Sequence, residues 1–218
     1  MKKGGVKVCM RVVVSVAMVL IIFEGLAHAQ QRYSLSSYFP LTEGATWTYL
    51  LIKPSPDLND VEVYSIARIN DPNFGFIYRR FLFDSGEQAL LYTYDDMKWS
   101  QKGLEVYRKV ERNLIPGGDS TIYDPPLVRF PASMSIGETF TDTNYEWSIT
   151  LEAAETVTVG IGTFTNCLKF EISYDGETWN IWLARGIGVV KNEQGLEVGG
   201  LVSFTKGGTT YYPIDPVP

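Results

Sequence analysis

Residues 168–183 read L-K-F-E-I-S-Y-D-G-E-T-W-N-I-W-L, two alternating runs on either side of one Asp-Gly pair. Asp175-Gly176 is typical of a two-residue type I′ turn, because both positions of that turn need a positive φ. With this loop, Tyr174 lies opposite Glu177 and the pairing runs outward from there. One face of the predicted hairpin then pairs Ile172 with Trp179, Phe170 with Ile181 and Leu168 with Leu183.

The other face of this hairpin is polar except at Trp182. It pairs Ser173 with Thr178, Glu171 with Asn180 and Lys169 with Trp182. A tryptophan has no packing reason to lie on a polar face, and tryptophan is common in binding hot spots. We therefore name Trp182 as a candidate contact residue. The alternative is that a second layer, such as the 207–218 tail, covers it.

A second hairpin is expected just upstream, in V-T-V-G-I-G-T-F-T-N-C-L-K-F at residues 157–170. Gly160 and Gly162 frame its turn. Strict alternation back from Phe170 points Asn166 inward and Cys167 outward, whereas a β-bulge near 166–167 would turn Cys167 inward. Both possibilities stay open. Cys167 is most simply a small buried apolar residue, with a reactive thiol or pairing with another chain as alternatives.

The remaining sequence also predicts short strands between Gly, Pro and Asp turns. Residues 95–103 are expected as a loop between strands, and Gly103 with its flanking alternation argues against a helix over 96–112. Together these patterns predict an all-β fold: a single antiparallel barrel, half-barrel or sandwich. The expected strands are 46–52, 61–69, 73–83, 89–94, 104–110, 189–191 and 200–206.

The N-terminus has the order of a secretory signal peptide. A basic segment precedes the apolar run 12–23, and Ala27-His28-Ala29 is a small-x-small cleavage site. The run of 12 residues is short for a membrane span, which needs about 20. We expect cleavage of 1–29 after Ala29, a periplasmic or secreted protein, and a single β-rich domain over 30–218 with no membrane span.

Signal removal would leave an acidic chain without histidine. It takes four of the 19 basic and one of the 25 acidic residues, so 15 and 24 remain and the formal charge is −9. Such a charge disfavours nucleic acid as a partner. The single histidine is His28, and Cys167 is the one cysteine left. A histidine-dependent catalytic triad, a histidine metal site and an internal disulfide are therefore excluded for the mature chain.

A faint repeat indicates two similar halves as one possible organisation. F-P-L-T-E-G-A-T-W-T at 39–48 and F-P-A-S-M-S-I-G-E-T-F-T at 130–141 share F-P and then G-x-T-aromatic-T. The halves would cover about 38–114 and 130–206, joined by a Pro-rich crossover at 115–131. Chance similarity between two strand entries is the alternative.

Several of these motifs carry a resemblance. Y-F-P-L-x-x-G-x-x-W-x-Y at 38–49, Y-D-P-P-L at 123–127, G-T-F-x-N-C-L-K at 162–169 and W-L-A-R-G-I-G-V-V-K at 182–191 resemble an uncharacterised family of secreted bacterial β-rich proteins. The resemblance implies a barrel or half-barrel, loosely similar to the carriers that move lipoproteins across the periplasm. It implies no catalytic residues.

Three weaker motifs are interpreted as structural. Ser203-Phe-Thr-Lys206 matches S-x-x-K but lies in strand alternation, where that chemistry needs a helix. Residues 57–62 offer oxygens for calcium without the glycine and glutamate of an EF-hand loop. Asp95-Asp96 beside Trp99 has the residue types of half a carbohydrate site, and Trp99 is the second candidate contact residue. A polar loop with one anchoring tryptophan is the alternative.

Three function classes remain. The first is a non-catalytic binding or carrier protein for an apolar or glycan ligand, favoured by the many aromatic residues. The second is a structural or interaction module that contacts an envelope protein. The third is a hydrolase that uses carboxylates only. We predict no catalytic residue, no metal site and no cofactor. An internal cavity of about 300 Å³ or more would favour the first class.

Overall fold

The computed structural model describes residues 31–53, 60–84, 92–112 and 120–211. The chain divides into two units, Met1–Arg32 and Tyr33–Pro218, and the description below concerns the second. The expected signal peptide therefore lies outside the described residues, as do 57–59 of the calcium motif and most of the 207–218 tail.

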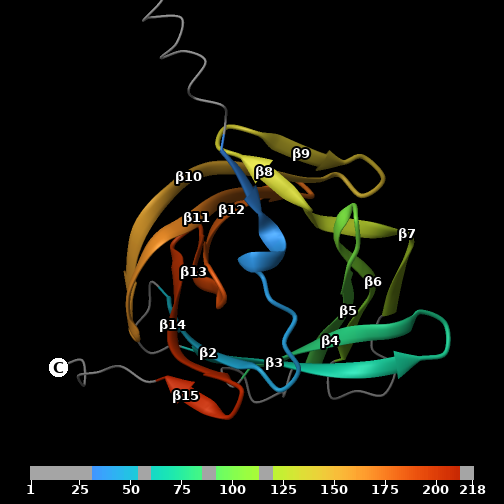
Figure 1. The fold of residues 1–218 in the computed structure, drawn as a ribbon, viewed down its shortest axis with the longest axis horizontal. Helices are drawn as coiled ribbons and strands as arrows, with labels where there is room; N and C mark the ends of the chain where they lie inside the picture. The colour runs from blue at the N-terminus through green and yellow to red at the C-terminus, as the bar shows by residue number, and fades with distance from the viewer. Residues whose placement is uncertain (1–30, 54–59, 85–91, 113–119, 212–218) are drawn as a thin grey trace, which may run out of the picture. The chain divides into compact units, whose positions relative to one another are not determined.

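In the described ranges, the fold consists of strands and one short 3-10 helix (Figure 1). The elements are β1 (Arg32–Ser34), η1 (Leu35–Ser37), β2 (Thr46–Ile52), β3 (Asp60–Asp71), β4 (Gly75–Asp84), β5 (Tyr92–Trp99), β6 (Gly103–Arg112), β7 (Ser120–Pro131), β8 (Ser133–Ser135), β9 (Thr139–Asp142), β10 (Trp147–Val159), β11 (Gly162–Tyr174), β12 (Glu177–Ala184), β13 (Gly188–Gln194), β14 (Glu197–Lys206) and β15 (Thr209–Tyr211).

One 13-stranded sheet curls into a nearly closed antiparallel barrel, which confirms the all-β prediction and selects the barrel among its alternatives. The strand order is β7-β6-β5-β4-β3-β2-β14-β13-β12-β11-β10-β9, with β15 beside β14, and a small second sheet pairs β1 with β8. The strands thus form two meanders, β2–β7 and β9–β14, that meet where β14 pairs with β2.

The two end strands of the sheet meet through side chains instead of a ladder. The Val128 N–H of β7 donates to Oδ2 of Asp142 in β9 at 3.0 Å, and Nε1 of Trp147 donates to the Arg129 carbonyl at 3.0 Å. Open strand edges attract further pairing, and these two bonds occupy one N–H and one carbonyl of β7 at its edge.

The hairpin over 168–183 has the predicted turn and register. Asp175 has φ 51° and Gly176 φ 76°, both positive as a type I′ turn requires. Tyr174 pairs with Glu177, and the ladder continues to Leu168 opposite Leu183. The predicted turn that Gly160 and Gly162 frame is also present, between β10 and β11.

The tip of the β10–β11 hairpin forms a second layer over neighbouring strands. The ladder of this hairpin shifts between Glu155 and Val157, and Asn166 has φ 55°, so the predicted β-bulge is present. Beyond the bulge, the Ile161 N–H donates to the Leu201 carbonyl of β14 at 3.2 Å. Cys167 is fully buried in a cluster with Trp182, separate from the cluster that holds Leu168.

Two expectations about the first half were wrong in detail. Residues 95–99 are not loop but the end of β5, because Asp95 and Asp96 find arginine partners on β4 and need no solvent. The described part of the expected crossover, 120–131, is strand β7. The prolines of β7 are tolerated because β7 is at the end of the sheet and pairs with β6 alone. A missing N–H on the other side of β7 therefore breaks no hydrogen bond to a second strand.

Candidate functional site: the cavity inside the barrel

A cavity of about 330 Å³ lies inside the barrel. It reaches the range of known ligand pockets, about 300–1,000 Å³. Its walls come from both meanders, and they are aromatic on some strands and charged on others. The lining residues are Phe39, Pro40, Trp47, Tyr49, Glu62, Tyr64, Ile66, Arg80, Lys109, Tyr123, Leu127, Arg129, Phe130, Trp147, Ile172, Tyr174, Trp179, Ile181, Gly188, Val189, Asn192 and Gln194.

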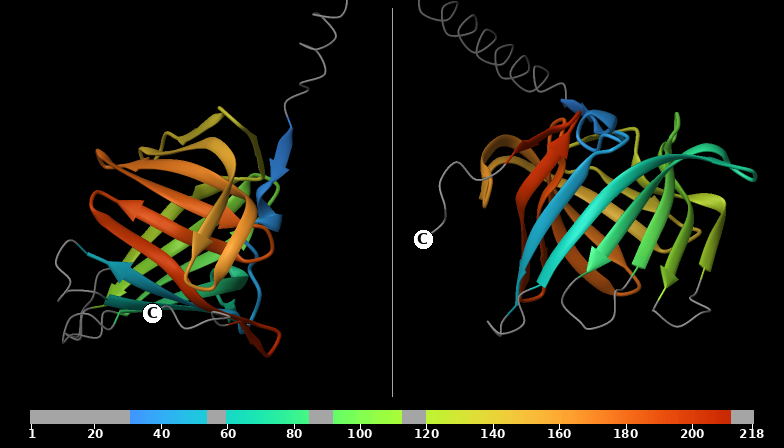
Figure 2. Two further views of the ribbon diagram at one scale, coloured as in Figure 1. Left: turned by 90° about the vertical axis from the view of Figure 1, so that its left-hand side faces the viewer. Right: turned by 90° about the horizontal axis from the view of Figure 1, so that it is seen from below.

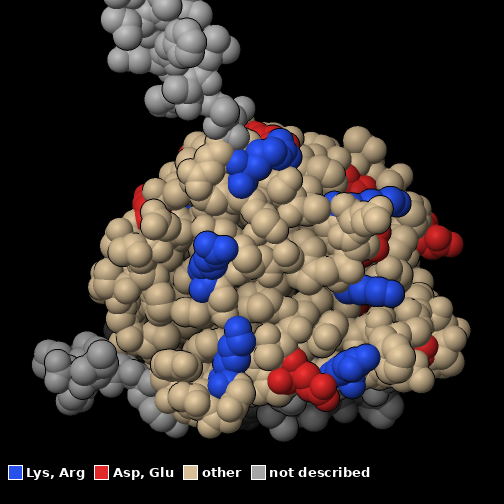
Figure 3. Space-filling view, in the orientation of Figure 1, with Lys and Arg blue, Asp and Glu red and all other residues tan. Residues whose placement is uncertain are grey.

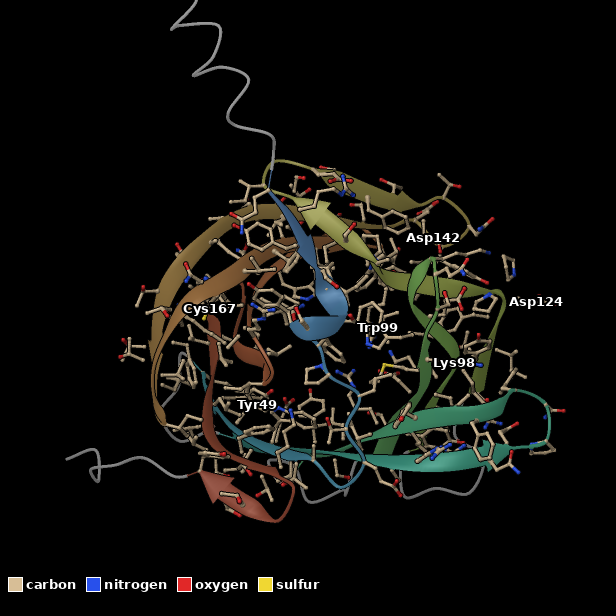
Figure 4. The ribbon with its side chains drawn as sticks, viewed as in Figure 1. Tyr49, Lys98, Trp99, Asp124, Asp142 and Cys167 are labelled. Atoms are coloured by element: carbon tan, nitrogen blue, oxygen red, sulfur yellow. The ribbon has the colours of Figure 1, made fainter. Side chains whose placement is uncertain are left out.

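The aromatic wall is held in place by hydrogen bonds at the polar ends of its rings. Nε1 of Trp47 donates to the Ile187 carbonyl, and the Tyr49 hydroxyl donates to the Val189 carbonyl, each at 2.7 Å. Figure 4 shows Tyr49 on the inner side of the ring of strands. Burial raises the pKa of Tyr49 well above its usual value. Because their polar ends are occupied, these rings offer mainly apolar surface to the cavity.

The charged wall is built around one buried carboxylate. Oδ2 of Asp95 accepts from Nη2 of Arg80 at 2.6 Å and from Nη1 of Arg129 at 2.8 Å. Lys109 lies directly opposite Asp95 in the β5–β6 ladder. Burial by itself would raise the pKa of Asp95, but Arg129 and Arg80 lower it to about 2. The group is therefore ionised at neutral pH.

Glu62 and Tyr64 lie next to this charged wall. The Tyr64 hydroxyl donates to Oε2 of Glu62 at 3.1 Å. Burial, followed by the charge of Glu62, raises the pKa of Tyr64 far above its usual value. Tyr64 is therefore a neutral donor at physiological pH. Among the described residues that line the cavity, Glu62 is the one acidic side chain.

A second ion network lies on the opposite side of the same strands. Asp96 is fully buried and accepts from Nε of Arg79 at 2.7 Å and from Nε of Arg108 at 2.8 Å. Nη2 of Arg108 also donates to Asp71 at 2.7 Å. None of these four residues lines the cavity, and two cations balance two carboxylates. We therefore assign this network to the stability of β3–β6.

Asn192 presents a buried acceptor at the cavity wall. Its Oδ1 is one of two buried side-chain oxygens, among the described residues, that have no hydrogen-bond partner. The opposite residue is Gly199, where an added Cβ would lie 1.8 Å from that oxygen. Glycine thus makes room for the amide. A bound molecule with a donor group would satisfy this acceptor.

The segment around η1 lies at one end of the barrel (Figure 2). It is held by backbone bonds from Leu35 N–H to Ala132 and from Gly186 N–H to Ser37, at 3.0 and 2.7 Å. Nε1 of Trp99 donates to the Phe39 carbonyl at 3.0 Å, and Phe39 lines the cavity. Figure 3 shows this face, where single Lys and Arg side chains are spread among uncharged ones.

Neither candidate contact residue lines the cavity. Trp99 anchors the segment around η1, as in the anchoring alternative. Trp182 is only 4% exposed and donates from Nε1 to Oε1 of Glu155. Nζ of Lys191 lies 4.4 Å from its ring centre. The second layer that covers Trp182 comes from the β10–β11 tip, which alternation alone did not indicate.

The environments of the other residues considered from the sequence indicate structural roles. Burial raises the pKa of Cys167 to about 11, so its thiol is not activated. Ser203 and Lys206 lie in β14, where Nζ of Lys206 donates to the Gly186 carbonyl at 3.1 Å. In the described ranges, no group of three His, Cys, Asp or Glu residues is placed to hold a metal ion. The same residues include no helix with the length and hydropathy of a membrane span.

Comparisons with known proteins give distant structural likenesses, and two of them are as follows. No family model and no curated protein matches the chain. A protein from Bacteroides fragilis, described as exported and as having a YMCC-like fold, is 16% identical, with a TM-score of 0.45 over 78% of this chain and 99% of its own. A protein from Parabacteroides distasonis, described as a lipoprotein, is 13% identical, with a TM-score of 0.40 over 77% of this chain and 98% of its own. Likenesses this weak carry no argument about this chain.

Proposed function

We propose that this protein is an exported, non-catalytic binding protein that holds a small, largely apolar ligand inside the barrel. The observation that carries the proposal is the cavity of about 330 Å³ between the aromatic wall and the charged wall. A largely preformed apolar pocket with a few convergent polar groups is the usual form of a ligand site. Export is supported by the signal-like residues 1–29.

The same lining argues against a carboxylate-only hydrolase. Such an enzyme needs two carboxyl groups that face the substrate. Asp95 is bound by Arg80 and Arg129, which leaves Glu62 as the acidic residue in the described lining. The arrangement therefore favours holding a molecule over cleaving it.

Titration with the neutral fluorophore N-phenylnaphthylamine tests this proposal. We expect emission to rise on binding to the wild type and to stay low with Val189→Trp, which fills the cavity. Ile122→Trp is the matched control, because Ile122 is 62% exposed and outside the lining. Circular dichroism would show that both variants are folded. Equal binding by the wild type and a folded Val189→Trp variant would contradict the proposal.

An interaction module is the second candidate, and one surface feature favours it. Ile52 and Leu196 are 53% and 79% exposed, at the end of β2 and in the adjacent turn before β14. Exposed apolar side chains that lie close together often mark contacts with other proteins. If this surface binds another protein, the double variant Ile52→Asp and Leu196→Asp would abolish that binding and leave the fluorophore titration unchanged.

A further inference from the structure

We infer that Phe39 sets the maximum length of the ligand, which lies lengthwise in the cavity with the end of an apolar chain against the Phe39 ring. The role of Phe39 rests on the proposed function and adds a class of ligand, a molecule with a single apolar chain. The cavity has one closed end and one exposed end, and Phe39 lies at the closed one.

The closed end is formed by the segment before β2, which crosses one end of the barrel (Figures 1 and 2). Within this segment Phe39 and Pro40 line the cavity, and Phe39 is only 7% exposed. Proline disfavours helical backbone at the residue before it, so the chain leaves the turn of η1 at Phe39. Phe39 belongs to the same buried cluster as Leu35 and Met134, both 0% exposed, so packed side chains close this end.

Several contacts fix the position of the Phe39 ring. The ring centre lies 5.6 Å from that of Phe130 in the barrel wall. The Phe39 N–H donates to the Leu35 carbonyl at 2.9 Å, and the Phe39 carbonyl accepts from Nε1 of Trp99 at 3.0 Å. A ring held in this way in a packed interior does not readily move aside for a longer ligand.

The opposite end of the cavity is lined by exposed side chains. The Gly186 N–H donates to the Ser37 carbonyl at 2.7 Å, which places the turn between β12 and β13 at the same end as η1. The far ends of these strands therefore lie away from η1, where β11 ends at Tyr174 and β13 ends at Gln194. Both residues line the cavity, Tyr174 is 44% exposed and Gln194 is exposed as well. A ligand therefore enters at this end.

The space between the two ends suits one apolar chain. A cavity of about 330 Å³ has room for on the order of ten groups the size of a water molecule. The aromatic wall offers apolar surface, because the polar atoms of Trp47 and Tyr49 are bonded to backbone carbonyls. A polar head group loses least hydration at the exposed end, beside Tyr174 and Gln194. The chain then points towards Phe39.

Displacement of N-phenylnaphthylamine by unbranched alcohols from hexanol to pentadecanol tests this role of Phe39. These alcohols are uncharged and differ in length alone. Each additional buried methylene group should strengthen binding about fourfold. In the wild type we expect this gain to stop at a chain of about ten carbon atoms, where the Phe39 ring blocks further insertion.

Substitutions at Phe39 should move this limit in both directions. Phe39→Ala removes the phenyl ring, and because the surroundings collapse only partly, the limit should rise by about three carbon atoms. Phe39→Trp introduces a larger ring and should lower the limit by about two carbon atoms. If Phe39→Ala does not fold, Phe39→Leu replaces it, with an expected rise of about one carbon atom.

Phe140→Ala is the matched control. Phe140 of β9 is a partly buried phenylalanine that packs against the same cluster as Phe39 but lies outside the cavity lining. We expect the chain-length limit of this variant to equal that of the wild type. Circular dichroism would show that each variant is folded.

The outcomes separate the role of Phe39 from the binding function. A gain that continues to pentadecanol in the wild type, or one limit shared by the wild type and all folded Phe39 variants, would overturn the role of Phe39. An equal rise for Phe140→Ala would overturn it as well, because general loosening would then explain the shift. Fluorophore binding that no alcohol displaces would overturn the single-chain class. No fluorophore binding by the wild type would contradict the binding function itself.

Discussion

Nη2 of Arg80 lies 2.6 Å from Oδ2 of Asp95 on the cavity side of the sheet. The next residues along both strands, Arg79 and Asp96, form a 2.7 Å pair on the other side. Strand alternation thus divides four consecutive charges into two networks, one that faces the cavity and one that does not.

The Asp95 carboxylate should make the fold sensitive to acid. Its pKa of about 2 lies below its ordinary value of 3.8, so the ionised form stabilises the fold above about pH 4 and this contribution is lost as the pH falls towards 2. The difference corresponds to about 2 kcal/mol. Asp95→Asn should cost roughly 3–5 kcal/mol at pH 7, because two largely buried guanidinium groups lose their shared partner.

Denaturant unfolding at several pH values measures both effects. The stability gap between wild type and Asp95→Asn should narrow by about 2 kcal/mol between pH 5 and pH 2. The exposed Ile122→Ala variant, which changes no titratable group, should show a pH-independent gap. A gap for Asp95→Asn that stays constant over this range would contradict the assigned role of the pair.

Trp182→Ala should destabilise the protein without weakening ligand binding. Trp182 is buried under the β10–β11 tip and lies outside the cavity. Truncation of a buried tryptophan costs roughly 3–5 kcal/mol. The measurements are the melting curve and the fluorophore titration. An unchanged melting temperature with weakened binding would reinstate Trp182 as a contact residue.

Gly103→Ala should be far more damaging than Gly186→Ala. A Cβ at Gly103 would lie 2.0 Å from the Phe130 carbonyl oxygen of β7, a backbone atom that cannot move aside. Gly186 also has positive φ, but a Cβ there meets nothing within 4 Å. We expect ~3 kcal/mol or more for Gly103→Ala and about 1 kcal/mol for Gly186→Ala from backbone strain alone. Equal costs in urea unfolding would show that the β6–β7 contact is absent.

Gly176→Val tests the turn that sets the register of the long hairpin. Gly176 has φ 76° with open space around its Cα, so the cost comes from the backbone alone. A β-branched residue with positive φ should cost about 1–2 kcal/mol or more. Gly176→Asn is the control, because asparagine tolerates this conformation and should cost less. A melting curve unaffected by valine would place the turn elsewhere.

Local patterns predicted the second meander well. An Asp-Gly turn and strict alternation determine the register of 168–183, since a one-residue slip would invert both faces. The bulge near Asn166 was one of two open possibilities. Trp182 is buried because the tip of the β10–β11 hairpin folds back over β14. The alternation of apolar and polar residues does not predict such a contact.

The sequence predicted the kind of site but not the residues that line it. The many aromatic residues indicated a binding site, but its lining comes from separate strands of both meanders and from Phe39. The sequence did not indicate which of the neighbouring charged side chains would face the cavity. Residues 95–103 were expected as a loop, whereas Asp95 and Asp96 lie in strand β5. Arg80 and Arg129 become partners only when β4, β5 and β7 lie side by side in one curled sheet.

Native mass spectrometry of the protein, purified without denaturant from its own host, tests most directly whether the barrel holds a ligand. We expect a wild-type species heavier than the polypeptide, whose extra mass is lost in denaturing solvent and is absent from the cavity-filled Val189→Trp variant. Mass analysis of the released compound should show a small, largely apolar molecule. Identical native and denatured masses for the wild type, or equal extra mass on both proteins, would contradict the account.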